Sequence, residues 1–124
     1  MAKELPIHLR RGKHAEDRAL TYLLSQGLQL LRRNYRTPHG EIDLIMLDSA
    51  LDELIFAEVR YRKNDRFGGA AQSVDKPKQA RLIASAEFFL QRHARFGNTP
   101  CRLDVIALSG GPEEGSLQWY QNAF

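Results

Sequence analysis

The chain has 124 residues and a formal net charge of +3, and 43% of its residues are hydrophobic, which is typical of one folded domain with its own core. Its single cysteine excludes an internal disulfide framework and a zinc site built from cysteines. No apolar run reaches the roughly 20 residues of a membrane span, and the N-terminus has no signal-peptide pattern, so we expect a cytoplasmic protein with no membrane partner.

The first predicted element is a helix over Gly12–Gln26, which follows a flexible arm at residues 1–9. Alanine and leucine residues recur along this helix at helical spacing and form an apolar stripe. Glu16 lies four residues before Leu20, so it falls on the edge of the stripe and not on the solvent side. The helix is expected to stop at Gly27, because glycine is a favoured helix terminator.

Three strands are predicted next, at Gly27–Tyr35, Gly40–Leu47 and Leu54–Tyr61. The last two should form a hairpin, because a polar connection of ordinary hairpin length joins them. A turn centred between Ala50 and Leu51 would pair residues whose numbers sum to 101. That register decides which charged side chains face each other across the hairpin.

This register places Asp43 opposite Glu58 and Glu41 opposite Arg60, with all four side chains on one face of the sheet. Like charges on directly opposed residues repel each other, so a pair of carboxylates at this spacing requires a cation. Mg²⁺ or Mn²⁺ held by Asp43 and Glu58 would meet that requirement and would support phosphodiester hydrolysis. The structural alternative is a cross-strand network of salt bridges in which Glu41 pairs with Arg60.

The rest of the chain is predicted to add a second helix and two strands, at Ser73 or Asp75 to Arg92, at Arg102–Leu108 and at Leu117–Tyr120. Gln79 falls on the apolar stripe of that helix. Asp104 interrupts the first of these strands and is either a member of the site or a structural carboxylate. The order αβββαβ with a short C-terminal edge strand predicts an α/β fold, in which residues 10–124 form one mixed sheet flanked by helices.

Basic residues gather in two segments, 10–36 and 60–81, which together hold 14 of the 18 lysines and arginines. Positive charge beside a carboxylate site suits a nucleic-acid partner, because phosphates dominate affinity for nucleic acids. A solvated basic surface is the alternative that charge alone leaves open. The residues expected to contact the nucleic-acid backbone are Arg10, Arg11, Lys13, Arg62, Lys63, Lys78 and Arg81.

The chain carries five ordered blocks that resemble the bacterial YraN-type family, namely GEIDLI, FAEVRYR, RFGGAAQSV, DKPKQARL and CRLDVIAL. The resemblance implies a restriction-endonuclease-like PD-(D/E)xK nuclease fold, similar to that of archaeal Holliday-junction resolvases. By position, it makes Asp43 and Glu58 the two motif acids and Glu16 a first-helix acid that joins their metal site. Gln79 matches a glutamine that would contact the substrate or a bound water.

Arg60 departs from this pattern, because it occupies the position where the wider superfamily has lysine. Arginine is a fixed planar cation that can clamp a phosphate but transfers protons poorly. We expect a metal-dependent endonuclease that acts on structured or branched DNA in preference to RNA, and a two-fold junction would suit a homodimer. Two other interpretations stay open, a non-catalytic nucleic-acid-binding module on a nuclease scaffold and a protein-interaction domain with structural carboxylates.

Overall fold

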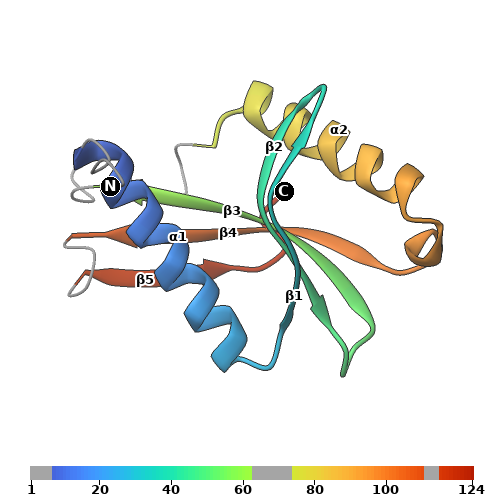
Figure 1. Cartoon of the computed structure of the whole chain (residues 1–124), viewed down its shortest axis with the longest axis horizontal. Coiled ribbons are helices and arrows are strands. Elements are labelled where there is room, and N and C mark those ends of the chain that lie inside the picture. The colour runs from blue at the N-terminus through green and yellow to red at the C-terminus, as the bar shows by residue number, and fades with distance from the viewer. Residues whose placement is uncertain (1–6, 63–73, 111–114) are drawn as a thin grey trace, which may run out of the picture.

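The computed structural model describes residues 7–62, 74–110 and 115–124, with side chains from Lys13 onward. These residues form two long helices and five strands (Figure 1). A single turn of 3₁₀ helix, η2 (Ala94–Phe96), lies between the second helix and the fourth strand. In chain order the main elements are α1 (Ile7–Ser25), β1 (Gln29–Thr37), β2 (Gly40–Asp48), β3 (Glu53–Arg62), α2 (Lys76–Arg92), β4 (Cys101–Ser109) and β5 (Ser116–Tyr120).

The element order predicted from the sequence is confirmed, and so is Asp75 as a cap of the second helix, while the first helix starts earlier than predicted. Helix α1 begins at Ile7, five residues before its predicted start, so residues 7–9 of the predicted arm are helical. Helix α2 is capped by Asp75, whose Oδ1 accepts a hydrogen bond from the backbone N of Lys78 at 2.9 Å.

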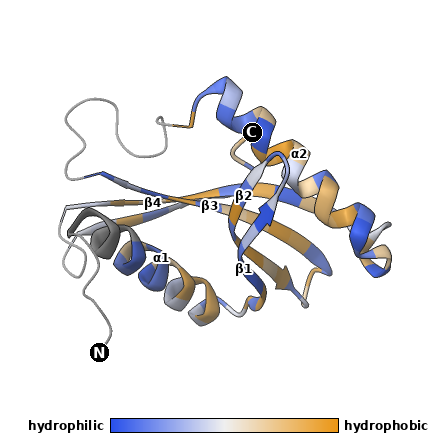
Figure 2. Ribbon diagram, turned by 45° about the horizontal axis from the view of Figure 1, so that its top comes forward, coloured by the Kyte–Doolittle hydropathy of each residue, from blue (hydrophilic) through white to orange (hydrophobic). Residues whose placement is uncertain are grey.

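The strands form one mixed sheet in the order β1-β2-β3-β4-β5, in which β3 and β4 run parallel and the other neighbours run antiparallel. Helix α1 covers one face through Ala15, Ala19 and Leu23, and α2 covers the opposite face through Ala86 and Phe89 (Figure 2). The sheet therefore separates two apolar cores, one beneath each helix. No helix in the described part of the chain is both long and apolar enough to cross a bilayer.

The predicted hairpin register is confirmed from the pair Leu44–Ala57 to the pair Asp48–Glu53. Pairing between β2 and β3 ends at Leu44–Ala57, while β2 continues to pair with β1 as far as Gly40. Beyond that point the two strands diverge, and the β1–β2 hairpin bends toward α2 (Figure 1). The sheet is therefore split between β2 and β3 beyond the pair Leu44–Ala57.

This split corrects the two charged pairs predicted from the register. Asp43 and Glu58 are not paired in the ladder, and neither are Glu41 and Arg60. Simple counting assumes that a hairpin ladder continues to the ends of both strands. Here the ladder ends one residue short of Asp43, so Asp43 and Glu58 approach each other across an opening.

The divergence coincides with an irregularity in β1 and β2. Asn34 of β1 has a φ of 54°, a left-handed conformation that asparagine tolerates better than most residues. Along β2, Leu44 packs in the core beneath α1 while Ile42 packs in the core beneath α2. Regular alternation would put both side chains on one face. The strand therefore twists sharply at Asp43, which directs the rest of the hairpin away from β3.

The tip of the β1–β2 hairpin is fastened to α2 by a hydroxyl pair. Thr37 Oγ1 lies 2.8 Å from the Oγ of fully buried Ser85 and accepts a hydrogen bond from the backbone N of Gly40 at 3.2 Å. We expect Thr37→Val to lower the free energy of unfolding by about 1–3 kcal/mol, because it leaves the Ser85 hydroxyl unpaired. Urea denaturation would measure this loss. Thr21→Val, at an exposed position of α1, is the control, and equal losses in both variants would contradict a fastening role.

Candidate functional site

A cleft of about 940 Å³ opens where β2 and β3 separate. Side chains from both helices and from β1, β2 and β3 line it. The charged residues among them are Glu16, Glu41, Asp43, Glu58, Lys13, Arg33, Arg36, Arg60 and Lys78. The fold thus gathers four of the five predicted catalytic residues in one place, and Gln79 is the exception.

Asp43 lies where the two strands part. Its Oδ2 accepts a hydrogen bond from the backbone N of Val59 at 2.8 Å, so the carboxylate takes the place of a ladder partner. Burial, followed by the nearby charge of Glu58, raises the pKa of Asp43 to about 7, while the hydrogen bond from Val59 opposes this rise. Near neutral pH this carboxyl group is therefore divided between its neutral and charged forms, and a bound cation would favour the charged form.

Glu58 is almost completely buried, with 4% of its side chain exposed. Its Oε1 lies 3.3 Å from Lys78 Nζ and 3.5 Å from Arg60 Nη1. Its Oε2 has no hydrogen-bond partner among the described residues. Burial raises the pKa of Glu58, although Lys78 and Arg60 act in the opposite direction. A buried carboxylate oxygen without a partner is costly, so a cation or hydrogen-bond donor that reached Oε2 would relieve that cost.

These donors would fit a small divalent cation held by two carboxylates. Mg²⁺ prefers oxygen ligands, keeps several waters and is usually bound by one or two protein carboxylates. Asp43 and Glu58 could supply those carboxylates, with Glu58 Oε2 as the unsatisfied acceptor. Within the residues that the structure describes, no group of three or more acidic, histidine or cysteine side chains is placed to hold a metal ion. The predicted set of three carboxylates is therefore not assembled.

Glu16 lines the cleft, but its carboxylate forms an ion pair. Its Oε1 accepts a hydrogen bond from Arg33 Nε at 2.6 Å, and Arg33 also binds the neighbouring Asp17. The charge of Glu16 nevertheless contributes to the raised pKa of Asp43. Arg33 was not predicted as a site residue. It stands in the run LLRRNY, and that run does not indicate which of its arginines turns toward α1.

Gln79 lies outside the cleft. Its Nε2 donates a hydrogen bond to the backbone O of Val74 at 3.0 Å, and its side chain lines a separate cavity with Trp119 and Phe124. Successive residues of a helix point about 100° apart, so when Lys78 faces Glu58 the next side chain must turn away. The predicted contact of Gln79 with the same substrate site therefore has no support in this arrangement.

The predicted nucleic-acid contacts divide into three groups. Lys13 and Lys78 line the cleft, while Arg62 and Arg81 are exposed beyond it. Arg36 of β1 also lines the cleft and was not predicted. Lys63 and the side chains of residues 10 and 11 lie outside the part that the structure describes. Basic groups from three separate segments therefore surround the carboxylate pair.

Comparison with known proteins gives one family. A family model described as "Uncharacterised protein family UPF0102" matches residues 15–108, which include every cleft carboxylate. A UPF0102 protein of Pseudomonas putida strain F1 is 54% identical over 116 residues, covering 93% of each chain. Another, of Pseudomonas fluorescens strain Pf0-1, is 50% identical over 117 residues, covering 94% of each chain. A third, of Alcanivorax borkumensis strain SK2, is 47% identical over 114 residues, covering 91% of this chain and 90% of its own.

Proposed function

This chain belongs to the uncharacterised protein family UPF0102, and we propose that it is a metal-dependent endonuclease of the restriction-endonuclease-like PD-(D/E)xK class. Its substrate would be nucleic acid, with structured or branched DNA preferred to RNA. The observation that carries the proposal is the buried Glu58 beside Asp43 in the lining of one cleft, with one buried carboxylate oxygen of Glu58 unpaired among the described residues. Both carboxylates are costly to bury.

The proposed chemistry is hydrolysis of a phosphodiester bond. When bound, Mg²⁺ or Mn²⁺ would supply positive charge that favours attack of water on phosphorus and departure of the sugar oxygen. Asp43 and Glu58 would hold that ion, and Glu16 would add negative charge from the α1 side of the cleft. Arg60 would bind a phosphate oxygen, since guanidinium groups match phosphate geometry.

Positive charge around the carboxylates supports a polyanionic substrate. Lys13, Arg36 and Lys78 lie along the cleft on three different elements, so a strand that crosses it would meet a cation from each side. Cleavage of a two-fold symmetric junction would require two such sites. A homodimer would therefore suit a branched substrate.

The function is tested by incubating the protein with labelled duplex, single-stranded and branched DNA and matched RNA, with and without Mn²⁺. We expect cleavage that requires Mn²⁺ and is lost in Asp43→Ala and Glu58→Ala, because each variant removes one metal ligand. Glu87→Ala, at an exposed position of α2, should cleave as the wild type does.

Two other outcomes would contradict the nuclease. Binding that weakens with salt but never leads to cleavage would replace it with a nucleic-acid-binding module. Absence of binding, together with a melting temperature that Mn²⁺ leaves unchanged, would reject both functions.

A further inference from the structure

We infer that Lys78, from the first turn of α2, supplies the ammonium group that binds the scissile phosphate. In the wider superfamily pattern, a lysine at the position of Arg60 would supply that group. The inference rests on the proposed function and adds a residue to it. Sequence spacing alone gives Lys78 no relation to Glu58, because they lie in different elements. The fold brings them together on one face of the sheet.

The position of Lys78 is fixed by the start of its helix. Asp75 caps α2 through its side chain, which binds the backbone N of Lys78 at 2.9 Å, and through its backbone O, which binds the N of Gln79 at 2.9 Å. Pro77 lies in the same first turn and restricts its backbone further. The Lys78 side chain therefore leaves α2 from a defined point and ends in the cleft, 3.3 Å from Glu58 Oε1.

Two cations meet at one oxygen of Glu58. Lys78 Nζ and Arg60 Nη1 lie 3.3 and 3.5 Å from Oε1, while Oε2 has no partner among the described residues. The two groups are not equivalent, because an ammonium is a compact charge with three rotatable donors and a guanidinium is a planar fork. About a third of the Lys78 side chain, 32%, stays exposed, so its ammonium can reach a phosphate that enters the cleft.

Lys78 would act on the phosphate during hydrolysis. The oxygen of water forms a bond to phosphorus, the bond from phosphorus to the sugar oxygen breaks, the proton of the water passes to solvent, and the leaving oxygen takes a proton from solvent. Negative charge accumulates on the non-bridging oxygens as this happens. A fixed ammonium beside them stabilises that charge more than it stabilises the bound substrate.

The test uses the full chain with Mn²⁺ and a branched DNA substrate. We expect Lys78→Met, which keeps the apolar stem, to lower kcat by about 10²-fold with a smaller change in KM, as for removal of one positioned charge donor. The rise in melting temperature on addition of Mn²⁺ should persist, because the two carboxylates are intact. Lys76→Met, at an exposed position of the same turn, is the control.

The double variant Lys78→Met/Arg60→Lys decides between a catalytic and a merely structural role. The inferred ammonium site is one that a lysine at position 60 would also reach, so Arg60→Lys should recover about 10-fold in kcat in the Lys78→Met background. An unchanged kcat in Lys78→Met, loss of its response to Mn²⁺, or no recovery in the double variant would overturn this inference alone. A wild-type protein that cleaves nothing would overturn the proposed function as well. If Lys78→Met is too unstable to assay, Lys78→Gln replaces it with the same expectations.

Discussion

Replacement of Asp43 with asparagine is expected to stabilise the protein at pH 8 and to remove its response to Mn²⁺. Burial and the charge of Glu58 raise the pKa of Asp43 from its ordinary 3.8 to about 7. At pH 8 the carboxylate is therefore charged in a place that disfavours charge. Asparagine removes this charge, and its side-chain oxygen can still accept the hydrogen bond from Val59.

The sign of the pH dependence follows from the direction of the pKa shift. A carboxyl group with a raised pKa binds its proton more tightly in the folded state than in the unfolded state. Its contribution to stability is therefore fully present below about pH 4 and is lost as the pH rises through about 7. The loss is at most about 4 kcal/mol, since one pKa unit corresponds to about 1.4 kcal/mol. Glu58, whose pKa is also raised, acts in the same direction.

Urea unfolding of both proteins between pH 5 and 9 would measure this effect. Wild-type stability should fall across the range, and Asp43→Asn should fall less and be the more stable protein at pH 8. Asp52→Asn is the matched control, because Asp52 is exposed in the hairpin turn and its left-handed φ of 53° suits asparagine. An Asp43→Asn protein that is less stable than wild type at pH 8 would show that the charged carboxylate does not destabilise the fold.

The metal response gives the second half of this prediction. An ion that binds only the folded protein stabilises it. The gain grows with the logarithm of the ion concentration once that concentration exceeds the dissociation constant. We expect Mn²⁺ to raise the melting temperature of the wild type and to leave Asp43→Asn unchanged. A buried charged carboxylate that destabilises the free protein but stabilises the ion-bound protein is typical of a functional site. Selection for stability alone would remove such a charge.

The sequence was sufficient to predict the element order and the hairpin register, and physical reasons explain why. Strand periodicity and a polar turn determine a hairpin locally, so the pairing of Leu44 with Ala57 follows from counting. The end of that pairing does not, because it depends on the twist at Asn34 and Asp43, where packing against two different helices decides the path. The prediction therefore found the right carboxylates but gave them the wrong geometry.

Contacts between distant elements explain the remaining differences. The approach of Lys78 to Glu58 depends on how the start of α2 packs against β3. The pair formed by Glu16 and Arg33 depends on how α1 packs across the sheet. Neither contact has a fixed spacing in the sequence, so pattern reasoning assigned Lys78 only to the nucleic-acid backbone and did not assign Arg33 at all.

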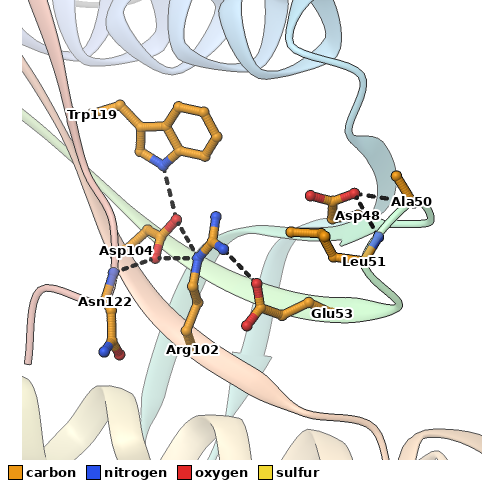
Figure 3. A network of polar contacts seen from close by, with 8 residues as sticks. All are labelled: Asp48, Ala50, Leu51, Glu53, Arg102, Asp104, Trp119 and Asn122. Atoms are coloured by element: carbon orange, nitrogen blue, oxygen red, sulfur yellow. Dashed lines mark hydrogen bonds and ion pairs between the residues drawn. The ribbon is translucent and has the colours of Figure 1, made fainter.

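Loss of the Asp104 carboxylate is expected to be strongly destabilising. Asp104 is fully buried, and its two oxygens accept hydrogen bonds from Asn122 N at 2.8 Å, Trp119 Nε1 at 2.8 Å and Arg102 Nε at 3.0 Å (Figure 3). Arg102 also forms an ion pair with Glu53. This network joins β3, β4, β5 and the C-terminal segment, which makes Asp104 the structural carboxylate of the two alternatives that the sequence left open.

Asp104→Ala should lower the free energy of unfolding by about 3–5 kcal/mol, because it leaves the nearly buried guanidinium of Arg102 short of a partner and also opens a cavity. Asp104→Asn keeps the shape and part of the hydrogen bonding, so it should cost less. Urea denaturation measures both. Because Asp104 does not line the cleft, the rise in melting temperature with Mn²⁺ should persist in Asp104→Asn. Loss of that rise in a folded Asp104→Asn protein would instead connect Asp104 to the metal site. If Asp104→Ala lowered the free energy of unfolding no more than Asp104→Asn does, the structural role would be contradicted.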